Sequence, residues 1–76
     1  MELNEFIAQF AEQFDDIDAS EIQASTVYKD LDEWSSLTVM SVIAFVKTEM
    51  GKTVTGKEIS GCTTVEALYN LIQSKL

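Results

Sequence analysis

Hydrophobic residues recur every three or four positions in the first part of the chain, with glutamate and glutamine at most positions between them. This spacing places the apolar side chains on one face of a helix. We therefore predict an amphipathic helix over roughly residues 2–14. Its apolar positions are Leu3, Phe6, Ile7, Phe10 and Phe14.

The segment 15–34, DDIDASEIQASTVYKDLDEW, mixes acidic residues with isolated apolar residues and has no sustained period. We predict a long loop here, with one short helical turn at most. A loop of about 20 residues is unusual in a compact domain unless it is functional or held by apolar side chains. The residues able to hold it are Ile17, Ile22, Val27, Leu31 and Trp34.

A second helix is predicted from about Ser36 to Met50, with Gly51 where a glycine commonly ends a helix. At about 100° per residue, its apolar residues fall into two groups. The group expected to face the core is Val39, Val42, Ile43, Val46 and Met50. The other group, on roughly the opposite side, is Leu37, Met40 and Ala44. Such a helix is either central to its domain or keeps one face for a partner.

Two further elements follow this helix. The segment Gly56–Gly61 has room for at most one helical turn, around Glu58 and Ile59. The last helix is predicted to begin at Thr-Thr-Val-Glu, with Thr63 as the N-cap and Glu66 three residues later in a capping box. Its buried face is Val65, Leu68, Leu71 and Ile72, with Tyr69 nearby.

These elements predict an all-α fold in a single domain over residues 1–76. The expected architecture is a bundle of three main helices and one short helix, with a long first loop and no strand. The predicted core is Phe6, Ile7, Phe10, Phe14, Val39, Val42, Ile43, Val46, Ile59, Val65, Leu68 and Ile72.

The net charge of −8 on only 76 residues narrows the choice of partners. Nucleic acids and anionic membranes would be repelled, so basic protein surfaces are the expected partners. Residues 1–33 carry ten acids and one lysine, a net charge of −9, and residues 34–76 carry three acids and four lysines, a net charge of +1. The acidic half also contains apolar residues throughout, so we expect it to fold rather than form a disordered tail.

The residue types present make an enzyme or a metal site a weak hypothesis. The chain has no histidine and only one cysteine, Cys62, so it lacks the commonest general base, a Cys/His zinc site and an internal disulfide. The acids around Asp16 mimic the start of a calcium loop, but Glu21 and Val27 stand where that loop needs glycine and glutamate. We predict no metal site and no catalysis by this chain.

The beginning of the chain gives an expectation about its location. Acidic residues stand where a signal peptide has basic ones, and no apolar stretch approaches the roughly 20 residues of a membrane span. We therefore expect a cytoplasmic protein without a membrane span. We also expect it to be a monomer. An unpaired cysteine fits a reducing compartment.

The candidate chemistry lies at Ser35 and Ser36, in the segment DEWSSLTVM at the start of the second helix. One serine is enough to cap a helix, because its oxygen accepts a bond from a free backbone N–H. A second hydroxyl at the positive end of the helix dipole, beside free N–H groups, favours an attached phosphate. With apolar Leu37 and Met40 beside it, this hydroxyl suits a covalently attached arm.

These features together resemble the acyl carrier protein family, whose members carry acyl groups as thioesters on a 4′-phosphopantetheine arm. The family attaches the arm at Asp-Ser-Leu at the start of its second helix, and Ser-Ser-Leu occupies that place here, so the resemblance makes Ser36 the modified residue. The segments VYKDLDEW and TTVEALYNLI resemble the family's long first loop and last helix. The resemblance therefore covers nearly the whole chain.

The resemblance implies a carrier with several partners and no catalysis of its own. A phosphopantetheinyl transferase would take the arm from coenzyme A, and acyl-transferring or condensing enzymes with basic docking patches would then act on the acyl group. It also implies that the bundle loosens to admit an acyl chain. Ser35 replaces the family's aspartate, and we expect it to serve as the helix cap, which leaves Ser36 free for the arm.

The second helix carries fewer acids than is usual in the family, with Ser41, Lys47 and Thr48 in the region and Glu49 remaining. We therefore expect partners to be recognised by a different set of residues, namely Asp30, Asp32, Glu33, Trp34, Leu37 and Met40. The ring of Trp34 has an alternative role, as a cover over the end of the bundle.

Three functions remain open within this interpretation. We favour a dedicated carrier for a specialised pathway, such as polysaccharide, lipid or secondary-metabolite synthesis, over the general carrier of fatty acid biosynthesis. A peptidyl or aminoacyl carrier would share the fold and the arm. The alternative from another class is an unmodified acidic helical interaction module, in which Ser36 only caps the helix.

Overall fold

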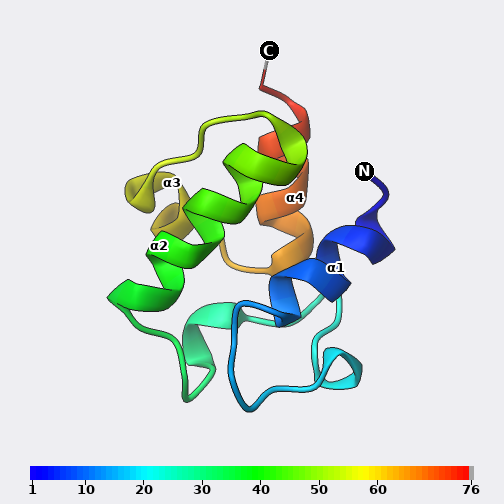
Figure 1. The fold of residues 1–76 in the computed structure, drawn as a ribbon, viewed down its shortest axis with the longest axis vertical. Helices are drawn as coiled ribbons and strands as arrows, with labels where there is room; N and C mark the ends of the chain where they lie inside the picture. The colour runs from blue at the N-terminus through cyan, green and yellow to red at the C-terminus, as the bar shows by residue number, and fades with distance from the viewer. Residues whose placement is uncertain (76) are drawn as a thin grey trace.

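The computed structural model describes residues 1–75, which form a helical bundle without strands (Figure 1). The main elements in this part of the chain are α1 (Leu3–Ala11), α2 (Ser36–Phe45), α3 (Gly56–Gly61) and α4 (Val65–Gln73). Short turns of 3-10 helix lie at Ala19–Glu21 and Tyr28–Asp30, and a π-helical turn at Val46–Met50 extends α2. The predicted all-α class, with a short third helix, is confirmed.

The first helix is shorter than predicted, because α1 ends at Ala11 and not near Phe14. The chain continues in turns of the i→i+3 type, in which Phe14 N–H donates to the Ala11 carbonyl over 3.1 Å. Phe14 remains buried as predicted, at 5% exposure. The turns therefore preserve the apolar face although the helical hydrogen bonds have ended.

The long loop closes the lower end of the bundle in Figure 1 and contains two helical turns, one more than predicted. The side chain of Tyr28 is fully buried, and its hydroxyl donates toward the carbonyls of Ile59 and Cys62 at the end of α3. The loop also supplies the carbonyls of Ala24 and Thr26, which accept bonds of 3.0 and 3.1 Å from the first N–H groups of α4. The loop is thus fixed to the second half of the chain.

These loop bonds explain why the predicted cap of the last helix is wrong. The N-cap of α4 is Thr64, whose hydroxyl oxygen accepts from Ala67 N–H over 3.1 Å, and not Thr63. The bonds from the loop fix Val65 as the first helical residue. Glu66 is then only the second helical residue, one position too early to complete a capping box.

The core-facing side of α2 is turned toward α1 relative to the prediction. Thr38 and Phe45 are buried beside Val42 and Val46, whereas Val39 is only half-buried. The cause is aromatic packing, because the Phe45 ring lies 5.5 Å from the ring of Phe6 in α1. Ile7 and Ile43, which were expected in the core, are likewise half-buried.

Most other predicted core residues are buried, but the prediction missed five hydrophobic positions in addition to Thr38. The buried residues that were predicted are Phe6, Phe10, Phe14, Val42, Val46, Ile59, Val65, Leu68 and Ile72. Those that were missed are Ala11, Ile22, Tyr28, Phe45 and Val54.

The short third helix is longer than the single turn that was predicted, with six residues from Gly56 to Gly61. Thr55 caps it, and the Thr55 N–H donates in turn to the Glu58 carboxylate over 3.0 Å. Glu58 also forms an ion pair of 2.7 Å with Lys75, so its pKa is lowered, first by the Lys75 hydrogen bond and then by the Thr55 bond. This cap gives α3 a defined start without a large buried face.

We expect Tyr28→Phe to lower the free energy of unfolding by about 1–3 kcal/mol, because two carbonyls in or near the core lose their donor. The measurement is urea denaturation followed by circular dichroism. Tyr69→Phe is the matched control, since that hydroxyl bonds to the exposed Met1 carbonyl. An equal loss in both variants would contradict the anchoring role of Tyr28.

The same residue predicts a loss of stability in alkali. Burial, and to a smaller extent Cys62, raises the pKa of Tyr28 above its ordinary value of 10.0. The unfolded chain therefore releases this proton from about pH 10 upward while the native protein retains it, and the free energy of unfolding falls as the pH rises. Denaturation at several pH values above 10 should show a steeper fall for the unmodified sequence than for Tyr28→Phe.

Candidate functional site

The side chain of Ser35 caps the start of α2. This residue is extended, with φ −154° and ψ 174°, and its hydroxyl oxygen accepts from Thr38 N–H over 3.4 Å. The first helical bond runs from Val39 N–H to the Ser35 carbonyl over 3.0 Å. Ser35 is therefore the N-cap, as expected.

Ser36 is the first residue of α2 and its side chain is exposed. Within residues 1–75 its hydroxyl makes no hydrogen bond, because Ser35 already performs the capping. The N–H groups of Ser36 and Leu37 precede the first helical bond of α2, so they are free to face a bound anion. An exposed hydroxyl beside free N–H donors fits a phosphate-linked group.

A strip of apolar side chains lies beside Ser36 on the surface of α2. Leu37 is 71% exposed and Met40 is 68% exposed, the largest values among the bulky hydrophobic residues within 1–75. Ala44, one turn further along, is exposed as well. We call these three residues the apolar strip. No large side chain of the described residues covers Leu37 or Met40, which suits contact with another molecule.

The acidic residues predicted to bind partners differ in whether they already form hydrogen bonds within the protein. Asp30 and Asp32 are exposed. The carboxylate of Glu33, in contrast, accepts bonds of 3.1 Å from the N–H groups of both Asp15 and Asp16. Glu33 thus joins the two ends of the long loop, a structural task that sequence reasoning did not identify.

The ring of Trp34 packs against the aromatic core at the end of the bundle. Its centroid lies 4.8 Å from the Tyr28 ring and 6.3 Å from the rings of both Phe10 and Phe14. The side chain is half-buried, so one part of it remains at the surface. Trp34 and Glu33 therefore hold the segment that leads into Ser35, and the role of Trp34 in partner binding stays a prediction.

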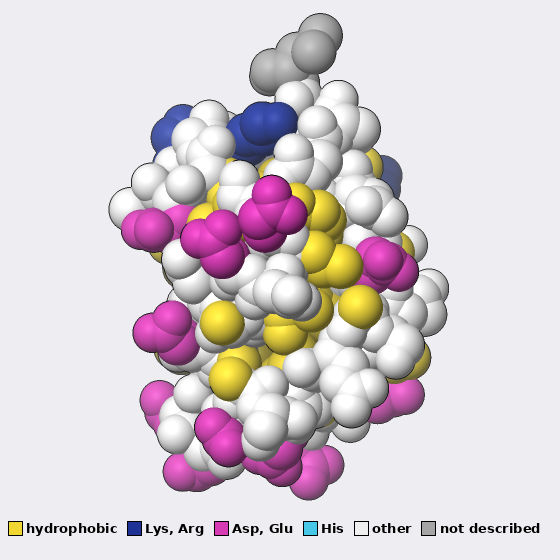
Figure 2. Space-filling view, turned by 90° about the vertical axis from the view of Figure 1, so that its right-hand side faces the viewer, with side chains coloured by type: hydrophobic (Ala, Val, Ile, Leu, Met, Phe, Trp, Pro, Cys, Tyr) yellow, Lys and Arg dark blue, Asp and Glu magenta, His cyan; other side chains and the backbone are white. Residues whose placement is uncertain are grey.

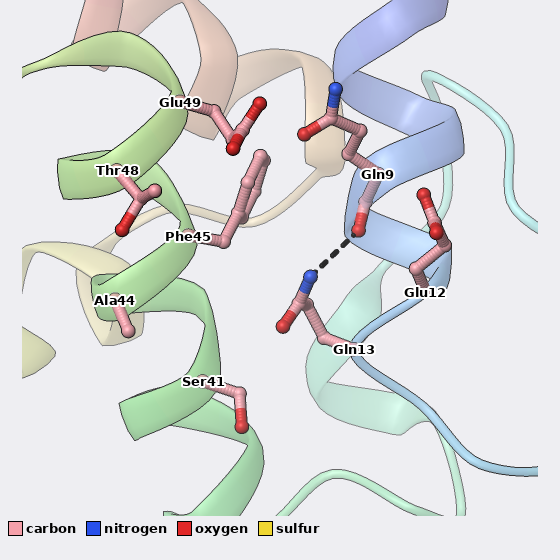
Figure 3. A pocket seen from close by; sticks show the side chains of 8 residues that line it. All are labelled: Gln9, Glu12, Gln13, Ser41, Ala44, Phe45, Thr48 and Glu49. Atoms are coloured by element: carbon pink, nitrogen blue, oxygen red, sulfur yellow. Dashed lines mark hydrogen bonds between the residues drawn. The ribbon is translucent and has the colours of Figure 1, made fainter.

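A groove between α1 and α2 was not predicted. It has a volume of about 400 Å³, and Phe45 forms its floor (Figure 3). Its lining residues are Gln9, Glu12, Gln13, Ser41, Ala44, Phe45, Thr48 and Glu49. A second groove of about 340 Å³ shares Gln13 and Ser41 with it and reaches Ser35 and Leu37. The polar residues that α2 presents toward α1 were the only sequence signal for this groove.

Most lysine side chains form hydrogen bonds or ion pairs within the protein. Lys29 donates to the Ser60 carbonyl over 2.7 Å at the end of α3, and Lys52 donates to the Lys75 carbonyl over 2.8 Å beyond α4. In the face drawn in Figure 2, lysines lie near the upper end, and acidic side chains spread from the middle to the lower end. The field around the long loop is therefore negative, which attracts basic partners.

Other chemistry finds little support among the described residues. Burial raises the pKa of the Cys62 thiol, which disfavours the reactive thiolate. No group of three or more His, Cys, Asp or Glu residues in the described chain is arranged to hold a metal ion. None of the helices described is long and apolar enough to cross a membrane.

Comparisons of this chain with models of known protein families, with curated proteins and with solved structures found no match. The assignment of function therefore depends on the geometry at Ser36 and on the sequence resemblance.

The two serines predict different effects on stability. Ser35→Ala should lower the free energy of unfolding by about 1 kcal/mol, because α2 loses its cap. Ser36→Ala should change it by less than about 0.5 kcal/mol, since the hydroxyl has no partner and alanine favours a helix. Urea denaturation of the two variants and of Ser35→Asp, which can still cap, tests the assignment. A larger loss for Ser36→Ala would reverse the roles.

Proposed function

We propose that this protein is an acyl carrier that holds its cargo on a 4′-phosphopantetheine arm attached to Ser36. The observation that carries the proposal is the exposed Ser36 hydroxyl, which has no partner in residues 1–75 because Ser35 caps the helix. A structural serine would be expected to make the capping bond itself. The resemblance of Ser-Ser-Leu and its surroundings to the carrier family's attachment site gives the hydroxyl its proposed role.

The start of α2 supplies what an attached phosphodiester requires. The free N–H groups of Ser36 and Leu37 and the positive end of the helix dipole favour its negative charge. The arm supplies the thiol that forms the thioester, so Cys62, which is half-buried and has a raised pKa, takes no part. The protein presents the cargo to enzymes and performs no catalysis itself.

The mechanism depends on effective concentration and on weak docking. A tethered acyl group meets the active site of a docked enzyme at a high local concentration. The enzyme binds through contacts with the apolar strip and through charge, which gives fast encounter and fast release. Asp30 and Asp32, both exposed, offer acidic contacts near Ser36 in the sequence. We propose that this carrier is a cytoplasmic monomer that serves a dedicated pathway. A peptidyl or aminoacyl carrier would work by the same mechanism with a different cargo.

One observation favours a second candidate, an interaction module that carries no arm. Leu37 and Met40 are mostly exposed, although residues that only stabilise the fold are usually buried. They could bind a partner without any modification of Ser36. The two candidates differ in a single chemical property, the ability of Ser36 to accept the arm.

Intact mass spectrometry after incubation with coenzyme A and a promiscuous phosphopantetheinyl transferase tests the proposal. The unmodified sequence should gain the mass of one arm, and peptide mapping should place that arm on Ser36. Ser36→Ala should fold and gain nothing, because it lacks the acceptor oxygen. The matched control is Ser35→Ala, which should still gain one arm. No mass gain with several transferases would favour the interaction module, and an arm on Ser36→Ala would refute the site.

A further inference from the structure

The helix that carries Ser36 has no charge of its own. The residues of α2, SLTVMSVIAF, include no acid and no base. A partner with a basic surface must therefore find its acidic contacts on the elements that flank α2. The structure shows which flank offers them.

The order of residues around α2 places the apolar strip between Ser36 and the groove. With 3.6 residues per turn, Met40 lies about 40° around the axis from Ser36, Leu37 about 100° and Ser41 about 140°. Ser41 lines both grooves on the α1 side, and Leu37 lines the second one. A partner that covers the apolar strip while it reaches Ser36 therefore meets the groove on its other side.

The groove carries free negative charge. Glu12 lines it from the end of α1, and Glu49 lines it from the turn after α2. In Figure 3 the Glu49 carboxylate extends above the Phe45 ring toward Gln9 of α1. No lysine lines the groove, and the one ion pair found in residues 1–75 involves neither glutamate.

The flank of α2 on the α3 side carries free positive charge instead of free negative charge. Lys57 is exposed on α3, and Lys75 neutralises the neighbouring Glu58 at 2.7 Å. A basic partner is thus repelled on the α3 flank and attracted on the α1 flank.

We propose that enzymes acting on this protein dock over the apolar strip and across the α1–α2 groove, where they insert a basic side chain between Glu12 and Glu49. Arginine suits the groove best, because its planar head can bond to carboxylate and amide oxygens together while its stem lies over Phe45. The inference rests on the proposed function, since the partner must cover the strip in order to reach Ser36.

Two other occupants fit the groove less well. A second copy of this chain brings another net charge of −8, which opposes contact between two acidic surfaces. An acyl chain would lie against Gln9, Gln13, Ser41 and Thr48, whose polar groups would lose water without gaining hydrogen bonds. Charge complementarity therefore selects a basic protein surface.

The test uses the full chain with Ser36→Ala, so that no arm can contribute to binding. The probes are a short amidated peptide of leucine, alanine and arginine, and a matched peptide in which uncharged citrulline replaces each arginine. Binding is followed by NMR of the ¹⁵N-labelled protein. We expect the arginine peptide to shift the amide signals of Gln9, Ser41 and Thr48, and to bind more tightly than the citrulline peptide.

Charge-neutral variants locate the contact. Glu12→Gln and Glu49→Gln should each weaken binding of the arginine peptide by about two- to fivefold. Glu66→Gln, which removes an exposed acid from α4, should leave it unchanged. Equal affinity of the two peptides, signal changes centred on Lys57 and Ser60, or an equal loss in Glu66→Gln would overturn the proposal. A protein that binds the peptide here but never accepts the arm would instead refute the carrier function alone.

Discussion

The bond from the Tyr28 hydroxyl to the end of α3 joins the long loop to the rest of the bundle, and the geometry at Ser36 depends on it. With Tyr28 buried, the Trp34 ring can pack against it at 4.8 Å, only two residues before Ser36. A polar group can occupy the core in this way because its hydrogen bonds are satisfied there. The loop thus has one position, although it lacks a regular structure of its own.

This anchoring gives the candidate site its division of roles. Glu33 joins the ends of the loop and also accepts, through its carbonyl, a bond of 2.9 Å from the Thr38 hydroxyl. Ser35 is therefore held in the extended conformation of a cap. The next hydroxyl, that of Ser36, is exposed to solvent at the first residue of α2.

Some charged side chains stabilise the fold, and others remain free at the surface. Lys29, Lys52 and Lys75 bond to carbonyls or to Glu58 within the chain, so they stabilise helix ends more than they balance the acids. Glu12 and Glu49 have no such partners among the described residues. Like charges repel one another in the folded state, so a small domain with this excess of negative charge stays folded only if its core is well packed.

The sequence by itself determined the all-α class, the approximate position of each main helix and the unusual pair Ser35–Ser36, because these follow from periodicity and capping chemistry within a few residues. It could not determine that Tyr28 is buried, that Thr64 replaces Thr63 as a cap, or that α2 turns Phe45 toward Phe6. Those features arise from contacts between residues far apart in the chain. Only the tertiary structure decides them, and with them the groove between α1 and α2.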